Sequence, residues 1–315
     1  MTLKVFRLIA VGFLLAAVVY FLGANASELS VLAELQLSTL LLVALIILVA
    51  TVLYAHSMYV YLEELLPSKM SGLQWQSLVF ASRLLNYTLP QGANIYRGGF
   101  LKTRYDLPVA TYVGVVLFHS WIFATLTFWA AVLLSAIIGA EQKILIACVL
   151  LAVGATLVAP LLAIRFPVNA EHPVVSWVVS RLRALSETLA RLGRHWAASL
   201  KLALIVIVTF LLTVASVYLL LAELNRAADI EAAVFLSIIF TLNRFVNVVP
   251  ANLGLTELLT GAAYEFLGGS LVAGILISGV LRVLEFIVAI VLGGAAIFFS
   301  DHRLNVADEK GTTGR

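Results

Sequence analysis

Long apolar runs dominate the pattern of hydrophobic and polar positions along the chain. A helix needs about 20 mainly apolar residues to cross roughly 30 Å of hydrocarbon. Runs of that length occur at about residues 5–24, 37–62, 107–138, 143–164, 197–222 and 270–299. The pattern therefore predicts an all-α polytopic membrane protein with about six full spans.

Two further apolar regions, 72–104 and 232–267, are interrupted near their middle. The first is interrupted at residues 86–92 and the second at 247–254, where Asn, Pro and Gly gather. Each half is too short to cross a bilayer alone, and unwound backbone is tolerated in hydrocarbon only where protein or a water-filled cavity satisfies it. We therefore expect two re-entrant helix pairs.

The two interrupted regions resemble each other in sequence. In both, an Arg-x-x-Asn motif is followed within a few residues by Pro, and the Arg and the Asn each recur after 161 residues. The flanking spans keep a similar offset, which predicts an inverted repeat of about 37–138 and 197–299, connected by 143–196. Inverted repeats with broken helices indicate a transporter-like site near the bilayer midplane. The motif residues are Arg83, Asn86 and Pro90 in the first copy, and Arg244, Asn247 and Pro250 in the second.

Composition excludes a soluble protein, because 62% of the residues are hydrophobic, only 12% are charged and the mean hydropathy is +1.06. Residues 1–300 are predicted to form one integral membrane domain, followed by a polar cytoplasmic tail at 301–315. The single cysteine, Cys148, excludes a disulfide framework. No nucleotide-binding, hydrolase or metal motif is present, so we expect neither an enzyme nor a cofactor.

The positions of Lys and Arg predict the orientation. With the N-terminus in the cytoplasm and both broken regions re-entrant, fourteen of the twenty lie on the cytoplasmic side. Only Lys143 and Arg226 lie outside, and the remaining four fall within apolar segments. This bias predicts a multi-pass membrane protein with both termini in the cytoplasm. Residues 1–26 also fit a signal peptide ending in Ala24-Asn25-Ala26, and its cleavage would leave this topology unchanged.

Six charged residues lie in or beside apolar helices: Arg83, Arg97, Arg244, Glu257, Arg282 and Glu285. Each costs about 2.5–3.5 kcal/mol at the centre of a membrane helix, so each needs a partner or a polar cavity. One interpretation is structural, with ion pairs Arg97–Glu257 and Arg244–Glu285 holding the bundle together.

The other interpretation is that the arginines face a cavity and bind an anionic head group, because a guanidinium matches phosphate with two hydrogen bonds. Exposed amides at the half-helix N-termini near Gly92 and Gly254 would add to that attraction. Asn86 and Asn247 are expected to cap the broken helices. His119 is either a proton relay or a hydrogen-bonded packing residue. The candidate substrate-binding set is Arg83, Asn86, Pro90, Gly92, Arg97, Arg244, Asn247, Pro250, Gly254, Glu257, Arg282 and Glu285.

These motifs resemble a known family. The segment Asn86-Tyr-Thr-Leu-Pro90-Gln-Gly92-Ala-Asn-Ile-Tyr-Arg97, the segment Val248-Val-Pro250-Ala-Asn-Leu-Gly254-Leu-Thr-Glu257 and the late Arg282 are similar to the flippase-like membrane family. That family comprises the transmembrane domain of lysylphosphatidylglycerol synthases and its stand-alone relatives. The chain departs from it where Ala93-Asn94 replaces a common Gly-Glu pair. The resemblance covers roughly residues 5–300 and implies a lipid translocase, or a partner in lipid or glycolipid synthesis, in the cell's inner (cytoplasmic) membrane.

Three hypotheses follow. The preferred one is a translocator of an anionic phospholipid or lipid-linked glycan, whose partners are membrane lipids and not nucleic acid. The second is an integral-membrane transferase, for which Glu257 is the sole candidate acid or base. The third is a non-catalytic membrane partner of a lipid or glycolipid synthase or glycosyltransferase, in which the Arg and Glu residues are structural.

Overall fold

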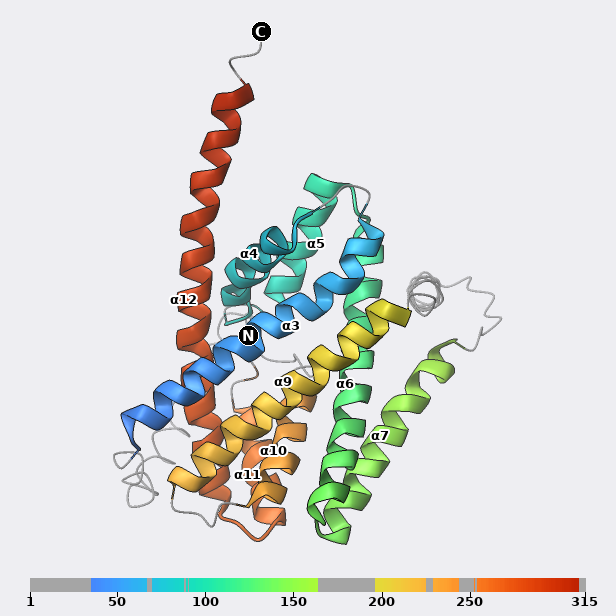
Figure 1. Ribbon diagram of the computed structural model, residues 1–315, viewed down its shortest axis with the longest axis vertical. Coiled ribbons are helices and arrows are strands. Elements are labelled where there is room, and N and C mark those ends of the chain that lie inside the picture. Colours follow the sequence, from blue (N-terminus) through green and yellow to red (C-terminus); the bar gives the residue numbers. More distant parts are fainter. Residues whose placement is uncertain are drawn as a thin grey trace, which may run out of the picture.

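The computed structural model describes residues 35–66, 70–87, 89, 91–163, 196–224, 229–243, 252 and 254–311, and every regular element in these ranges is helical. Figure 1 shows their arrangement. In chain order they are α3 (Leu37–Leu65), α4 (Gly72–Arg83), the 3-10 helix η2 (Leu84–Tyr87), α5 (Gly92–Tyr105), α6 (Val109–Ile138), α7 (Gln142–Ala163), α9 (Trp196–Glu223), α10 (Ile230–Asn243), α11 (Leu255–Phe266) and α12 (Leu271–Gly311).

Four helices in the described ranges are long and apolar enough to cross a bilayer: Leu37–Glu63, Val109–Ile138, Ala197–Glu223 and Leu271–Phe298. They confirm four of the six predicted spans. The predicted span at 143–164 coincides with α7, whose described apolar stretch, Gln142–Leu157, is shorter than a full span. The predicted span at 5–24 lies outside the described residues. The protein is thus an all-helical membrane protein in the part that the structure describes.

Both interrupted regions contain two short helices, and the interruptions fall where the sequence predicts them. In the first region α4 ends at Arg83, η2 follows, and α5 begins at Gly92. In the second, α10 ends at Asn243 and α11 begins at Leu255. The pair α4 and α5 lies toward the upper end of the molecule in Figure 1, and the pair α10 and α11 toward the lower end. The two pairs therefore occupy opposite ends of the bundle.

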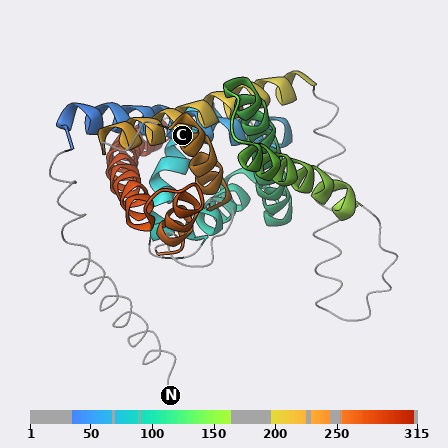
Figure 2. The ribbon, with the colours of Figure 1, turned by 90° about the horizontal axis from the view of Figure 1, so that it is seen from below.

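The helix α3 lies beside α9, and both views show the two together along one side of the bundle (Figures 1 and 2). They run antiparallel, since the carboxylate of Glu223 at the end of α9 accepts hydrogen bonds from Gln36 and Thr39 at the start of α3. The short pairs lie between α6 and α12 (Figure 1). There α4 packs against α12 and α10 packs against α6, so each half of the chain contacts the long helix of the other half.

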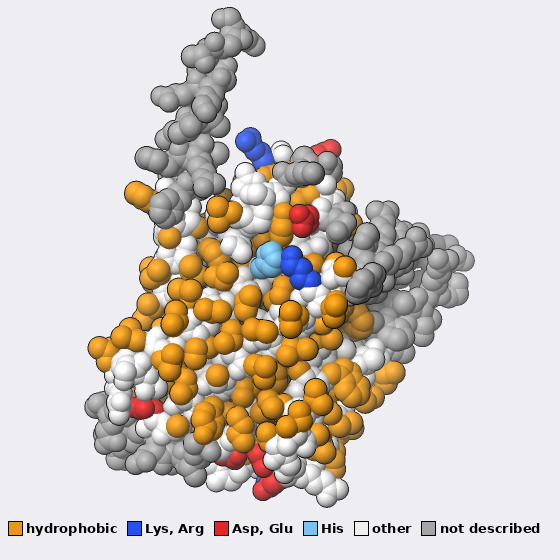
Figure 3. All heavy atoms as spheres, viewed as in Figure 1, with side chains coloured by type: hydrophobic (Ala, Val, Ile, Leu, Met, Phe, Trp, Pro, Cys, Tyr) orange, Lys and Arg blue, Asp and Glu red, His pale blue; other side chains and the backbone are white. Residues whose placement is uncertain are grey.

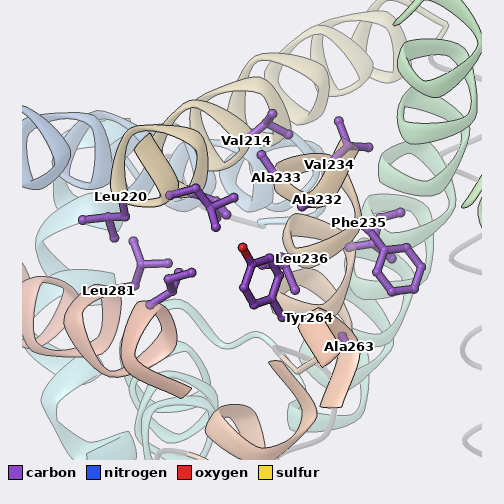
Figure 4. Close-up of a cluster of buried hydrophobic side chains, with 14 of the residues drawn as sticks. Val214, Leu220, Ala232, Ala233, Val234, Phe235, Leu236, Ala263, Tyr264 and Leu281 are labelled. Atoms are coloured by element: carbon purple, nitrogen blue, oxygen red, sulfur yellow. The ribbon is translucent and has the colours of Figure 1, made fainter. Parts of the chain in front are cut away.

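Two clusters of buried apolar side chains hold this arrangement. The larger one joins α9, α10, α11 and α12 through residues such as Leu220, Leu236 and Tyr264 (Figure 4). The other surrounds Trp75 of α4, whose indole N–H donates to the Ala55 carbonyl oxygen at 2.7 Å. Because buried aromatic side chains with satisfied polar atoms pack in one orientation, these clusters fix the short helices against the long ones.

The outer surface carries the apolar side chains that lipid would cover. A wide band of hydrophobic side chains crosses the middle of the face shown in Figure 3. The charged side chains on this face lie above and below the band. The end formed by the last turn of α5 and the start of α9, here called the basic end, carries Lys102, Arg104 and Lys201 together with Glu63 and Asp106. The opposite end, here called the acidic end, carries Glu141, Lys143, Glu223, Asp229, Glu231 and Glu265.

Candidate substrate cavity

A cavity of about 860 Å³ lies inside the bundle, where the interrupted helices meet the long ones. Its walls come from both halves of the chain: α3 to α6 from the first, and α9 to α12 with Asn252 from the second. Five of the predicted site residues line it, namely Arg83, Asn86, Arg97, Arg282 and Glu285. The cavity thus brings together four of the six charged residues that lie in or beside apolar helices, and Asn86 with them.

Each of the three arginines is attached to the cavity wall by a neutral acceptor. Arg83 donates to the Thr51 hydroxyl at 3.0 Å. Arg97 is only 8% exposed, and its Nε donates to the Ser82 hydroxyl at 3.0 Å. Arg282 donates to the Asn252 carbonyl oxygen at 3.4 Å and to the Thr256 hydroxyl. Neutral acceptors orient Arg83 and Arg97 without cancelling their charge, whereas Arg282 is also paired with Glu257, so the positive charge of the cavity comes mainly from Arg83 and Arg97.

Glu257 is bound twice within the protein and does not line the cavity. Its Oε1 lies 3.2 Å from Nε of Arg282, and its Oε2 accepts the backbone N–H of Gly254 at 2.7 Å. The predicted Arg97–Glu257 pair is therefore wrong. Glu257 caps its own helix, and the packing of α12 on α11 brings Arg282 to it, whereas Arg97 faces Ser82 of α4 and Tyr112 of α6.

The expected free amides at the two half-helix N-termini are occupied. Asn86 Oδ1 accepts the Ala93 N–H at 2.9 Å, which confirms Asn86 as a cap, and the Gly92 N–H donates to the Leu89 carbonyl oxygen at 3.0 Å. The Gly254 N–H is held by Glu257. Gly92 and Gly254 thus shape the breaks and do not line the cavity.

The remaining predicted residues fall elsewhere. Pro90, Arg244, Asn247 and Pro250 lie outside the described residues, and the predicted Arg244–Glu285 pair lies there with them. His119 lines the cavity, is buried, and its Nε2 hydrogen-bonds the Ser57 hydroxyl at 2.7 Å with its ring against Tyr54. It is therefore a hydrogen-bonded packing residue, one of its two predicted roles.

The structure adds polar lining residues that the sequence analysis did not select. Tyr112 donates from its hydroxyl to Asn94 Oδ1 at 3.2 Å, and Asn252 donates from its side-chain amide to the Asn243 carbonyl oxygen across the second break. Asn243 lies next to the sequence motif, and within the described structure its buried side-chain amide has no hydrogen-bond partner on either atom. Its polar character at the end of an apolar helix was the available signal, whereas nothing in sequence distinguishes Tyr112 from a packing aromatic.

The donor set is suited to an anion and not to a metal ion. Among the described residues there is no group of three or more His, Cys, Asp or Glu side chains close enough to hold a metal. Three arginines and one glutamate line the cavity, again counting described residues, which leaves an excess of positive charge. Amides and hydroxyls beside them can donate to further oxygen atoms of a bound group.

The fold and the cavity define a class: a polytopic helical membrane protein with an internal cavity whose mainly apolar wall carries three arginines. A family model described as the lysylphosphatidylglycerol synthase TM region matches residues 4–293, and the chain belongs to that family. This confirms the resemblance inferred from the motifs and indicates a membrane protein of lipid synthesis or transport. No curated protein and no solved structure matches the chain.

Proposed function

We propose that the protein is a lipid translocase that moves an anionic phospholipid or a lipid-linked glycan across the cell's inner membrane. The observation that carries this proposal is the cavity that Arg83, Arg97 and Arg282 line inside a bundle of membrane-length helices. The proposal assigns no catalytic step. The head group would pass through the cavity while its negative charge is balanced by the arginines.

The chemistry of the cavity supports an anionic head group. A guanidinium presents several N–H donors in a plane and binds phosphate through two of them. In a site shielded from water such charge-assisted bonds are strong, because the competing solvent is excluded. The volume of about 860 Å³ lies within the range of roughly 300–1,000 Å³ of small-molecule sites, enough for a head group.

The packing pattern supports an inverted repeat with re-entrant pairs. If the repeats are equivalent, α3, α4, α5 and α6 correspond in order to α9, α10, α11 and α12. The packing of α4 on α12 then corresponds to that of α10 on α6, and the packing of α3 on α12 to that of α9 on α6. All four contacts are present. Each short pair also begins and ends at the same end of the molecule in Figure 1. Repeats of this kind allow one cavity to be reached alternately from either membrane surface.

The distribution of charge supports an orientation. Among residues whose side chains are described, Lys143 is the single Lys or Arg at the acidic end, whereas Lys102, Arg104 and Lys201 lie at the basic end. Since Lys and Arg are enriched on the cytoplasmic side of membrane proteins, we infer that the basic end faces the cytoplasm. This agrees with the orientation that the whole sequence predicts, with both termini in the cytoplasm.

A specific observation favours the second candidate, a non-catalytic membrane partner of a lipid or glycolipid synthase or glycosyltransferase. Glu257 and Arg282 neutralise each other, and Glu257 also caps α11. This part of the charged set is explained by stability alone. If Arg83 and Arg97 are structural as well, their loss would affect folding and partner binding and not lipid movement.

The experiment is lipid movement in proteoliposomes, measured with head-group-labelled anionic lipids and purified protein. We expect the wild type to move the label and Arg97→Gln to lose that movement. Arg104→Gln is the matched control, since Arg104 lies on the same helix but is exposed at the basic end and does not line the cavity. Each variant is compared by thermal unfolding in detergent, so that a folding defect is recognised.

Three results are informative. Loss of movement in a folded Arg97→Gln, with retention in Arg104→Gln, supports translocation through the cavity. Equal movement in both variants contradicts the role of Arg97. Absence of movement by the wild type for several anionic phospholipids and polyprenyl-phosphate glycans contradicts unaided translocation and favours the partner role, which isolation of a bound synthase or glycosyltransferase would then test.

A further inference from the structure

The exposed residues among the described lining of the cavity all belong to two neighbouring helices, α5 and α6. Among the described lining residues, the exposed ones are Ile95 and Gly99 of α5 and Val109 and Leu117 of α6. Ile95 is 70% exposed, Leu117 46% and Val109 38%. The lining residues of the other elements are buried or half-buried. The cavity therefore reaches the outer surface between α5 and α6, a seam that we call the α5–α6 seam.

The seam is held apart by an aromatic side chain. The ring of Tyr112 packs on Gly98, where an added Cβ would lie 3.1 Å from the ring, and its hydroxyl donates to Asn94. One residue further, a Cβ at Gly99 would meet no atom within 4 Å. The two helices thus touch through Tyr112 and leave open space beside it.

The corresponding seam of the second half, between α11 and α12, is closed. An added Cβ at Gly274 would lie 2.8 Å from both the Gly261 Cα and the Thr260 carbonyl oxygen. A Cβ at Gly261 would in turn lie 2.8 Å from the Leu271 carbonyl oxygen. Glycine pairs of this kind let helix backbones approach closely in membranes. The two halves therefore differ at this seam, which is tight in one and open in the other.

We propose that the α5–α6 seam is a lateral portal through which an acyl chain of a membrane lipid enters while its head group occupies the cationic cavity. This proposal rests on the proposed function and deepens it by naming how the substrate enters. The substrate is a lipid whose acyl chain stays in hydrocarbon during entry, and not a free anion. Outside the seam a bilayer offers hydrocarbon, because α6 is a membrane-length apolar helix. The exposed lining side chains Ile95, Val109 and Leu117 are apolar and match that phase.

The dimensions and charges of the seam fit this occupant. From Val109 to Leu117 the seam extends about 12 Å along α6, at 1.5 Å per residue, which places it in the half of the span nearest the basic end. Lys102 and Arg104 are exposed in the last turn of α5 at that same end. They can attract an anionic head group to the membrane surface, from which Arg97, one to two turns earlier on the same helix, leads into the cavity.

The test detects acyl chains inside the cavity directly. Purified protein is placed in phosphatidylcholine vesicles that contain phosphatidylglycerol with a photoactivatable diazirine in one acyl chain. After illumination, adducts on peptides are located by mass spectrometry. The interior readout is Met58, which is buried and lines the cavity, and the reference is Ile137, which is exposed on the outer face of α6 and does not line it. We expect adducts at both residues in the wild type.

Gly99→Phe is the blocking variant, since its side chain extends into the open seam without meeting packed atoms. Gly154→Phe is the matched control, because Gly154 is also an exposed helical glycine with open space around its Cβ but does not line the cavity. In Gly99→Phe we expect the ratio of Met58 to Ile137 adducts to fall about tenfold, equivalent to about 1.4 kcal/mol of lost binding. In Gly154→Phe we expect the wild-type ratio.

Two results of the labelling experiment overturn the portal: no Met58 adduct in the wild type, or a Met58 adduct that persists in Gly99→Phe. Neither depends on transport, so the failure of the portal is distinguishable from the failure of the proposed function. If Met58 is labelled through the seam but the head-group-labelled lipid does not cross the membrane, lipid entry stands and translocation is wrong. If the lipid crosses in Gly99→Phe at the wild-type rate, translocation stands and this route is wrong.

Discussion

At the scale of single residues, the two breaks use glycine for different reasons. Gly92 lies against the backbone, where a Cβ would come within 2.7 Å of the Leu85 carbonyl oxygen. A Cβ at Gly254 would meet no atom within 4 Å, but the φ of this residue is 83°, a backbone conformation that residues other than glycine disfavour. Packing therefore requires glycine at position 92, and backbone conformation requires it at position 254.

Gly92→Ala is expected to destabilise the protein by about 1–3 kcal/mol, because the carbonyl that its Cβ would meet is backbone and has little freedom to move. Thermal unfolding in detergent measures the effect. Gly154→Ala is the control, since its Cβ meets nothing within 4 Å. Equal melting temperatures for the two variants would contradict the close approach at Gly92.

The Glu257–Arg282 pair gives a second prediction at this scale. Glu257→Gln should lower the free energy of unfolding by about 1–3 kcal/mol, because it leaves the partly buried Arg282 without its counter-charge. The double variant Glu257→Gln with Arg282→Gln should lose less than the sum of the single variants. Glu141→Gln, which removes the exposed pair with Lys143, should cost at most about 0.5 kcal/mol. Additive losses at 257 and 282 would show that the two side chains do not interact.

At the scale of elements, the stability of the second half depends on how closely α11 and α12 approach. Each of the two glycines at their contact, Gly261 and Gly274, faces backbone of the other helix. The first half has no such contact between α5 and α6, where Tyr112 separates the helices. The two pairs thus pack differently because of the residues at their contacts, two glycines in one and Tyr112 in the other.

Gly274→Ala is therefore expected to destabilise the protein by about 1–3 kcal/mol, since its methyl group would force α11 and α12 apart. Gly279→Ala is a control on the same helix, with nothing within 4 Å of its Cβ, and alanine there should be neutral or slightly stabilising. The melting temperatures of the two variants in detergent measure this difference. A Gly274→Ala variant as stable as Gly279→Ala would mean that the helices are not in close contact.

At the scale of the whole molecule, charge separates to the two ends of an apolar bundle (Figure 3). The surrounding band of hydrophobic side chains has no need of charged partners, because lipid covers it. Among the described residues, the charges inside the bundle lie at the cavity or beside it, where hydroxyls accept from Arg83 and Arg97, and Arg282 pairs with Glu257. The positions of the charged residues thus separate the lipid-facing surface from the interior, and they also indicate the orientation in the membrane.

This arrangement predicts which residues a membrane-impermeant thiol reagent reaches in intact cells. In a Cys148→Ser background, which removes the single and buried cysteine, Glu141→Cys at the acidic end should be labelled from outside. Thr103→Cys, exposed at the basic end, should be labelled only after the membrane is permeabilised. The reverse pattern would invert the orientation, and labelling of both in intact cells would contradict the assignment of opposite ends.

The sequence by itself determined four membrane-length helices, the two breaks and the presence of charged residues in or beside apolar helices. These features are local: 20 apolar residues must cross as a helix because lipid offers the backbone no hydrogen bonds, and a short segment in which Asn, Pro and Gly gather interrupts a helix. The set of arginines and the cap at Asn86 followed from the same reasoning.

Only the tertiary structure decided which charges meet and where the cavity opens. The structural interpretation of the sequence paired Arg97 with Glu257, but the close packing of α11 and α12 brings Arg282 there instead. The role of Tyr112 and the open seam beside Gly99 likewise depend on side chains from two helices and on the distance between them. Pairings across helices are set by the packing of the whole bundle, and hydropathy along one chain carries no information about that distance.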